Sequence, residues 1–152
     1  MKTIATWMIM LLVIVSLTQC NKASNEEDPT PAPGVTKTEL LAGTSARSWV
    51  MTSLKFDGKE SFGQSIICSK DDNTVYRTDK TYEVNEGESK CRSDGEQVYE
   101  KGTWAFNGDE SELIINNTDR YKVLELNNTT LRLSIKTLFG ETVETTFKKK
   151  AT

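Results

Sequence analysis

The chain has 152 residues and a formal net charge of −3 at pH 7, which excludes the basic surface that nucleic-acid binding requires. It contains no histidine, so Ser-His-Asp and Cys-His catalysis are excluded and the commonest zinc ligand is missing. Carboxylate chemistry stays open, but the sequence places no pair of carboxylates face to face. We therefore expect one domain plus a tail, with no enzymatic activity, no metal and no cofactor.

The first twenty residues predict export and lipid attachment. The apolar block Ile4–Leu17 is shorter than the about 20 residues that a membrane-spanning helix needs, so residues 1–19 are typical of a signal peptide. The run Leu17-Thr18-Gln19-Cys20 resembles a bacterial lipobox, except that Gln19 stands where Gly, Ala or Ser is usual. A lipid on Cys20 would hold the protein to a membrane in the cell envelope, on the periplasmic or the outer face of the outer membrane. An ordinary secretory signal or an uncleaved anchor is the alternative.

Residues 20–37 are predicted to form the lipid anchor and a flexible linker. Residues 21–37 are rich in Pro, Ala, Asn and acidic side chains, so they cannot bury enough apolar surface to offset the entropy lost on ordering. The acidic run Glu26-Glu27-Asp28 is either solvated linker charge or a signal for display at the cell surface. The folded domain is expected over residues 38–152. A short helix opens it, because Thr36-Lys37-Thr38-Glu39 fits a capping box and Gly43 can end the turn.

From Trp49 onward, short β-prone runs alternate with turn residues, which is typical of a sandwich or a barrel. Alternation is clearest at Leu131, Leu133 and Ile135, which share one face of their strand. Mostly short connections favour an up-and-down antiparallel meander of eight or nine strands, closed into a barrel so that no edge is exposed. The expected strands are Trp49–Phe56, Ser61–Cys68, Thr74–Thr78, Thr81–Asn85, Glu96–Phe106, Glu112–Asn116, Tyr121–Leu126, Thr130–Leu138 and Glu141–Lys149.

Two cysteines, Cys68 and Cys91, remain after the lipobox. Outside the cytoplasm disulfides persist, and two thiols there most simply pair with each other. Closing that loop would stabilise the fold by roughly 3 kcal/mol. A two-thiol metal site is the alternative, but no histidine or further cysteine accompanies it. An immunoglobulin-type sandwich ranks second to the barrel, because it expects a tryptophan between its cysteines and none lies between these two.

The acidic run Asp71-Asp72-Asn73 has oxygen ligands of the kind that calcium prefers. It lacks the glycine and the distal glutamate of an EF-hand loop. Aspartate and asparagine also favour turns, so the sequence predicts a turn before the strand that starts at Thr74.

Several short motifs follow one another along the chain: Leu40-Leu41-Ala42-Gly43, Ser48-Trp49, Cys68-Ser69-Lys70-Asp71-Asp72-Asn73 with Tyr76, then Cys91, Gly102-Thr103-Trp104 and Leu113-Ile114-Ile115. Their order is similar to that of the bacterial lipocalin-like lipoproteins that are common in Bacteroidetes. The resemblance covers roughly Thr38 to Lys149 and implies a small, lipocalin-like antiparallel β-barrel of about eight strands. In animal lipocalins the Gly-x-Trp motif lies in the first strand, whereas here it falls in mid-domain.

Trp49, Trp104 and Phe106 are the candidate ligand-binding residues, on the expected inward face of the barrel. Large aromatic side chains either form the floor of a pocket or plug a barrel of this size, and the plug is favoured here. The expected function is non-enzymatic binding of a small apolar or amphipathic ligand by a membrane-anchored protein. The alternative is an envelope protein-protein interaction module or inhibitor with a filled barrel. A cavity of about 300 Å³ or more would support ligand binding.

Overall fold

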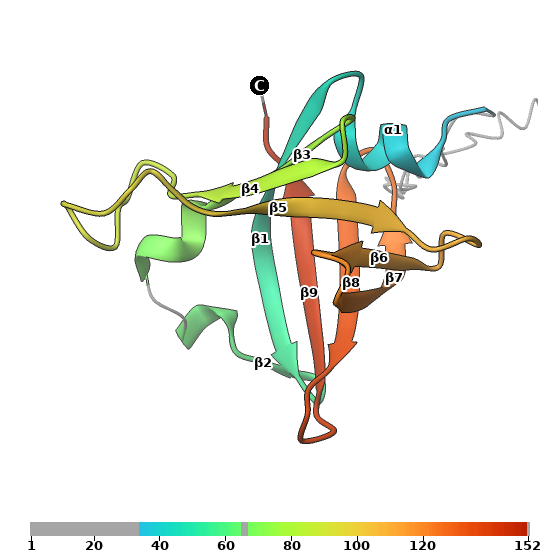
Figure 1. The fold of residues 1–152 in the computed structure, drawn as a ribbon. Coiled ribbons are helices and arrows are strands. Elements are labelled where there is room, and N and C mark those ends of the chain that lie inside the picture. Colours follow the sequence, from blue (N-terminus) through green and yellow to red (C-terminus); the bar gives the residue numbers. More distant parts are fainter. Residues whose placement is uncertain (1–33, 65–66, 152) are drawn as a thin grey trace, which may run out of the picture.

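In the computed structural model, residues 34–64 and 67–151 are described. Cys20, the signal peptide and most of the linker lie outside the described residues, so the predictions made for them are not tested by the fold. The described part forms one closed antiparallel β-barrel with a short helix across one end (Figure 1).

The helix α1 (Lys37–Ala42) begins at the predicted capping box. The Thr36 hydroxyl accepts a hydrogen bond from the Glu39 amide at 3.2 Å, and the Glu39 carboxylate accepts one from the Thr36 amide at 2.8 Å. Gly43 ends the helix with a φ of 67°, a backbone conformation that favours glycine. The apolar side of α1 is buried against the barrel, which confirms the predicted short helix.

Nine strands follow the helix, and eight of them close the barrel. The sheet order is β2-β1-β3-β4-β5-β6-β7-β8-β9, and a further pairing of β1 with β9 joins the two sides. Every pairing is antiparallel, so the predicted up-and-down barrel is confirmed. The strands are β1 (Ala46–Phe56), β2 (Lys59–Glu60), β3 (Asn73–Arg77), β4 (Thr81–Asn85), β5 (Val98–Phe106), β6 (Glu112–Ile115), β7 (Asp119–Leu126), β8 (Thr130–Lys136) and β9 (Thr142–Lys149).

The long strand β1 is what allows the sheet to close. Its first half, Ala46 to Val50, pairs with β3, and from Trp49 onward it pairs with β9. The pairing with β9 shifts register between Met51 and Ser53, an irregularity that lets a strand bend. As a result β3, β4 and β5 run across the upright strands β1, β8 and β9 (Figure 1).

The predicted strand Ser61–Cys68 is wrong. The chain there forms two 3-10 turns, η1 (Phe62–Gln64) and η2 (Ile67–Asp71), with residues 65–66 outside the described part. The Glu60 carboxylate accepts hydrogen bonds from the Leu54 amide at 3.2 Å and the Phe62 amide at 3.0 Å, which turns the chain away after two residues of β2. β9 and the short β2 occupy the second half of β1, so the run meets no partner strand there.

One end of the barrel is closed and the other is open. Trp49 is fully buried, and its indole N–H donates to the carbonyl of Leu41 in α1 at 2.8 Å. Lys37 and Lys80 tie α1 to the turns at the same end, through the Glu110 carbonyl and the Thr38 hydroxyl. The opposite end holds η1, η2 and the long connection between β4 and β5 (Figure 1). The helix α1 therefore blocks this end of the barrel.

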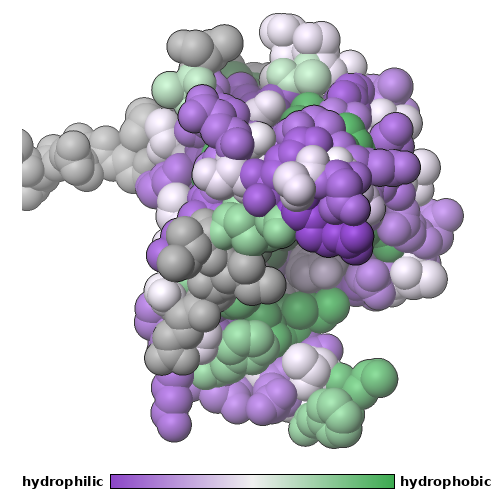
Figure 2. Space-filling model, turned by 90° about the vertical axis from the view of Figure 1, so that its left-hand side faces the viewer, coloured by the Kyte–Doolittle hydropathy of each residue, from purple (hydrophilic) through white to green (hydrophobic). Residues whose placement is uncertain are grey.

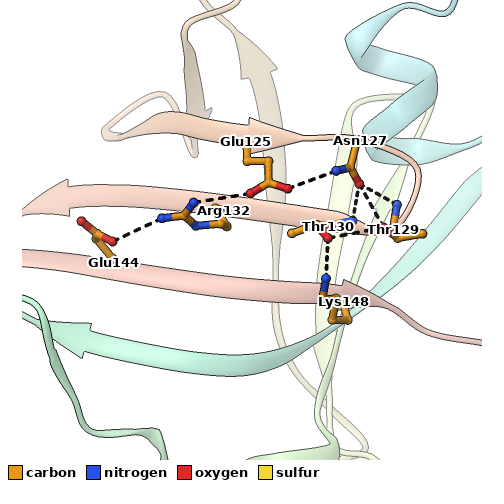
Figure 3. A network of polar contacts seen from close by, with 7 residues as sticks. All are labelled: Glu125, Asn127, Thr129, Thr130, Arg132, Glu144 and Lys148. Carbon is orange, nitrogen blue, oxygen red and sulfur yellow. Dashed lines mark hydrogen bonds and ion pairs between the residues drawn. The ribbon is translucent and has the colours of Figure 1, made fainter. Parts of the chain in front are cut away.

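A polar network fixes the outside of the barrel over β7, β8 and β9 (Figure 3). The buried side chain of Asn127 accepts hydrogen bonds from the amides of Thr129 at 2.9 Å and Thr130 at 2.7 Å, closing the β7–β8 turn. Arg132 lies between the carboxylates of Glu125 and Glu144, at 3.4 and 3.7 Å. Cross-strand pairs of this kind hold the register of neighbouring strands.

Candidate functional site

The open end of the barrel contains an apolar hollow of about 190 Å³. Figure 2 shows this side of the molecule, where apolar side chains gather beneath a hydrophilic upper region. The side chains come from β1, β3, β4, β5 and β9, from the two 3-10 turns and from Asp72 between η2 and β3, so the hollow is the mouth of the barrel. Its lining residues are Met51, Leu54, Phe62, Ser69, Asp72, Thr74, Val84, Tyr99 and Phe147.

A second hollow of about 150 Å³ lies next to the first, because Thr74 and Val84 line both. Its composition is different, with three tyrosines and one carboxylate among eight residues. Neither hollow alone reaches the size of a usual ligand pocket. The two are neighbours that share the cross-strand pair Thr74 and Val84 as a wall. The second hollow is lined by Thr74, Tyr76, Tyr82, Val84, Glu100, Ile115, Tyr121 and Leu133.

The register of β4 and β5 places the carboxylate of Glu100 in this space. Val84 lies opposite Glu100, and Tyr82 lies opposite Gly102, so all four residues share the inward face. The Tyr82 hydroxyl donates a hydrogen bond to Glu100 Oε1 at 2.5 Å. Asn116, in the turn after β6, donates from Nδ2 to the same hydroxyl oxygen at 3.1 Å. Two partners thus hold the ring of Tyr82 in one orientation.

Gly102 makes this arrangement possible. A Cβ atom at that position would lie 2.7 Å from Cε1 of Tyr82 and would collide with the side-chain oxygen of Asn116. That oxygen accepts a hydrogen bond from the Thr103 amide at 3.0 Å, so Asn116 cannot move away freely. The glycine of the Gly-x-Trp motif therefore leaves room for the tyrosine and the asparagine at the wall of the second hollow.

The electrostatics of the space are set by burial and by Glu100. Burial raises the pKa of Tyr76 and Tyr121, and the nearby Glu100 carboxylate adds to both shifts. Burial together with the hydrogen bond to Glu100 raises the pKa of Tyr82 to about 12. These phenols stay neutral in the physiological range. None of the described residues that line the second hollow carries a positive charge.

The rim of the mouth is also acidic. The Tyr99 hydroxyl donates to Oδ2 of Asp72 at 2.8 Å, and burial raises the Tyr99 pKa, with Asp72 adding to the shift. Oδ1 of Asp72 is buried and has no hydrogen-bond partner in the structure. A buried acceptor without a donor costs free energy, so this oxygen can accept a hydrogen bond from a ligand that reaches the mouth.

The Asp71-Asp72-Asn73 run closes the rim, and Asn73 opens β3. Oδ2 of Asp71 accepts hydrogen bonds from the amides of Glu88 at 2.6 Å and Ser89 at 3.0 Å. Among residues 34–64 and 67–151, no group of three or more His, Cys, Asp or Glu side chains is placed to hold a metal ion.

A disulfide bond links two segments of the same rim. Cys68 in η2 and Cys91 in the β4–β5 connection are joined, with their Cα atoms 5.0 Å apart. The predicted pairing is therefore confirmed. Because the two segments flank the mouth, the bond restricts how far the rim can open.

The three aromatic residues predicted to bind ligand lie in the core. Trp49 and Trp104 are buried, and Phe106 packs against the same cluster, with its ring 5.7 Å from that of Trp104. None of them lines either interior hollow. Trp104 contacts the site through Tyr76, whose ring meets it edge-on at 6.0 Å. Their side chains fill the core, as expected of residues that plug a barrel. Their ligand-binding role stays a prediction.

None of the residues that line the hollows was predicted from the sequence to bind an organic ligand. Glu100 breaks the alternation of an amphipathic strand, because it is an acid on the inward face of β5. Gly102 of the Gly-x-Trp motif was the available signal, since a glycine inside a strand indicates close approach of another group. The register of β5 against β4 decides which side chain approaches Gly102, and only the structure shows that register.

A larger hollow of about 520 Å³ lies at the opposite end of the barrel, beside the end of α1 and the C-terminal residues. It is bordered by Arg47, Lys149 and Lys150 and shares no residue with the two interior hollows. In the described part of the chain, no helix is long and apolar enough to cross a membrane.

The lipocalin-like domain family model matches residues 46–133, from the first residue of β1 into β8. The chain belongs to the lipocalin-like domain family. No curated protein matches it. A lipocalin-like barrel is generally a binding fold rather than an enzyme fold, and its ligands lie in the mouth. The first hollow occupies that place in this barrel.

Proposed function

We propose that this protein binds a small apolar or amphipathic molecule inside its barrel and carries out no chemistry on it. The observation that carries the proposal is the pair of neighbouring hollows, the first of which opens at the end away from α1. The mouth supplies apolar walls from Met51, Leu54 and Phe147, and Asp72 supplies a free acceptor at its edge. An apolar site with a few polar anchors is the usual composition of a small-molecule pocket.

Isothermal titration calorimetry with 1-hexanol tests this proposal. Val84 lines both hollows, so Val84→Phe should fill them and abolish the heat of binding. Val75→Phe is the matched control, because Val75 pairs with Ser48 and Glu83 on the outward face. Binding of 1-hexanol that survives Val84→Phe, or that is absent from the unmodified protein, would contradict the proposal.

The lipid anchor at Cys20 is part of the same proposal. The described chain starts at residue 34 and enters α1 at the closed end, so a tether to a membrane leaves the mouth free on the opposite side (Figure 1). The expected location is the cell envelope, attached to the outer membrane. Mass spectrometry of the mature N-terminus tests it: an acylated Cys20 as the first residue supports the anchor, and an unmodified or uncleaved chain overturns it.

One observation favours the alternative of a protein-binding module. Leu138 and Phe139, at the tip of the β8–β9 hairpin, are 102% and 90% exposed. Figure 2 shows a hydrophobic projection at the bottom of the molecule, where this hairpin lies in Figure 1. An envelope partner that docks there would be lost in a Leu138→Ser, Phe139→Ser double variant. The same variant should leave binding of 1-hexanol unchanged, so the two functions separate.

A further inference from the structure

The second hollow combines one carboxylate with three aromatic rings. Glu100 lies at its exposed rim, and Tyr76, Tyr82 and Tyr121 line its walls. The rings of Tyr76 and Tyr82 lie 6.0 Å apart and are tilted by 31°. No ion pair in the described part of the chain involves Glu100, whose contact with Tyr82 is a hydrogen bond. The rim of the second hollow thus carries a negative charge that no ion pair of the described residues neutralises.

This chemistry selects the charge of the ligand. The face of an aromatic ring attracts a cation, by about 0.5–2 kcal/mol depending on exposure, and a carboxylate adds a full opposite charge. An anionic ligand would meet the Glu100 carboxylate with no cation to offset it. A metal ion such as calcium needs six or more oxygen ligands, whereas this hollow offers one carboxylate and neutral phenols. An organic cation is the class that uses both the rings and the carboxylate.

We propose that the interior site takes a small amphiphile with an ammonium or quaternary ammonium head, held between Glu100 and the three tyrosines. The inference rests on the proposed binding function and names the ligand class of that same site. The apolar tail of such a ligand extends past Thr74 and Val84 into the mouth, toward Met51 and Phe147.

The site is already arranged for this ligand. Glu100 and Asn116 both bond the Tyr82 hydroxyl, so the ring is fixed before a ligand arrives. The negative charge of Glu100 also acts on Tyr76 and Tyr121, because it contributes to the raised pKa of each. A cation bound among these groups would be stabilised by the same field, and a site ordered in advance loses less entropy on binding.

Calorimetric titration with three six-carbon probes tests the proposal: hexyltrimethylammonium, 1-hexanol and hexanoate. The tail is the same in each, so differences in affinity report on the head. We expect hexyltrimethylammonium to bind about tenfold tighter than 1-hexanol, a factor that corresponds to about 1.4 kcal/mol, and hexanoate to bind more weakly than either. Glu100→Gln should bring hexyltrimethylammonium to within about twofold of 1-hexanol.

Two controls separate local contact from general charge and from loss of fold. Glu96→Gln removes the same charge from the exposed connection before β5, and the tenfold preference should remain. Tyr121 is only half-buried, so Tyr121→Phe and Tyr121→Leu can be compared without emptying the core. The ring-preserving Phe variant should keep the preference, and the Leu variant should reduce it.

The outcomes distinguish this inference from the function on which it rests. Binding of 1-hexanol with no preference for hexyltrimethylammonium, or a preference that survives Glu100→Gln, overturns the cationic ligand and leaves the binding function standing. Absence of binding by all three probes overturns the binding function itself. A preference lost in Glu100→Gln and kept in Glu96→Gln supports the inference.

Discussion

At the scale of single residues, the site depends on a glycine and not on the tryptophans that stand out in the sequence. Gly102 faces Tyr82 across the β4–β5 pair and Asn116 in the turn after β6, and a side chain at this position would collide with both. Trp49 and Trp104 instead fill the core. Both tryptophans stand out in the sequence because their side chains are large and apolar. In a small barrel that apolar surface packs in the core.

Gly102→Ala should therefore damage both stability and binding. The added methyl group overpacks the wall of the second hollow, with an expected loss of about 1–3 kcal/mol in the free energy of unfolding. Urea denaturation measures the first effect, and titration with 1-hexanol the second. Gly108→Ala is the control, because no atom lies within 4 Å of the added Cβ. Equal stability of the two variants would contradict this role of Gly102.

The raised pKa of Tyr82 should lower the free energy of unfolding at alkaline pH. Its pKa is about 12 in the folded protein, against about 10 in the unfolded chain, so the folded state holds its proton more tightly. The free energy of unfolding should be insensitive to this group below pH 10 and should fall between pH 10 and 12. Tyr82→Phe should make that fall shallower, as measured by denaturation at each pH. An identical slope in the variant would rule out Tyr82 as a cause.

Asn127 is the third residue with a testable role, in the turn that joins β7 to β8. Its side chain satisfies two backbone amides while itself buried. Asn127→Ala leaves those donors unpaired and should cost about 1–3 kcal/mol in thermal or chemical unfolding. Its exposed neighbour provides the control: Asn128→Ala should change stability by less than about 0.5 kcal/mol. Similar losses in both variants would show that the side-chain bonds are unimportant.

At the scale of elements, the sequence predicts the strands where alternation and turn residues agree. The strand Thr81–Asn85 was predicted with its observed bounds, and the helix cap at Thr36 is present in full. The prediction failed at Ser61–Cys68, because strand formation needs a partner and β9 and β2 already occupy the second half of β1. The alternation of residues within one segment does not show that other strands already pair with the edge it would need.

The rim is the element whose stability depends on a covalent bond. Cys68 and Cys91 are 23 positions apart, and a loop of that length closed by a disulfide stabilises the fold by about 3 kcal/mol. Cys68→Ser with Cys91→Ser should lose about that amount in chemical denaturation and should weaken binding of 1-hexanol. Reduction of the unmodified protein with dithiothreitol should reproduce both effects. A double variant as stable as the original protein would show that the rim is held by its hydrogen bonds alone.

At the scale of the whole molecule, the two ends of the barrel differ, since one is closed and the other holds the mouth. The helix, Trp49 and Leu41 close one end, and the chain enters there. The opposite end holds the mouth, the disulfide and the exposed hairpin tip. A barrel of this class could be predicted from short alternating runs, but the interior site could not. It depends on which inward residues face each other across β4 and β5, and one residue of slip would reverse them.

The most direct test of the account is a two-dimensional NMR titration of the isotopically labelled barrel with 1-hexanol. We predict that the amide signals of Thr74 and Val84, which line both interior hollows, move as the ligand is added. The signals of Leu138 and Phe139, at the exposed tip, should stay in place. Shifts confined to the tip, or no shifts at all, would contradict a ligand site inside the barrel.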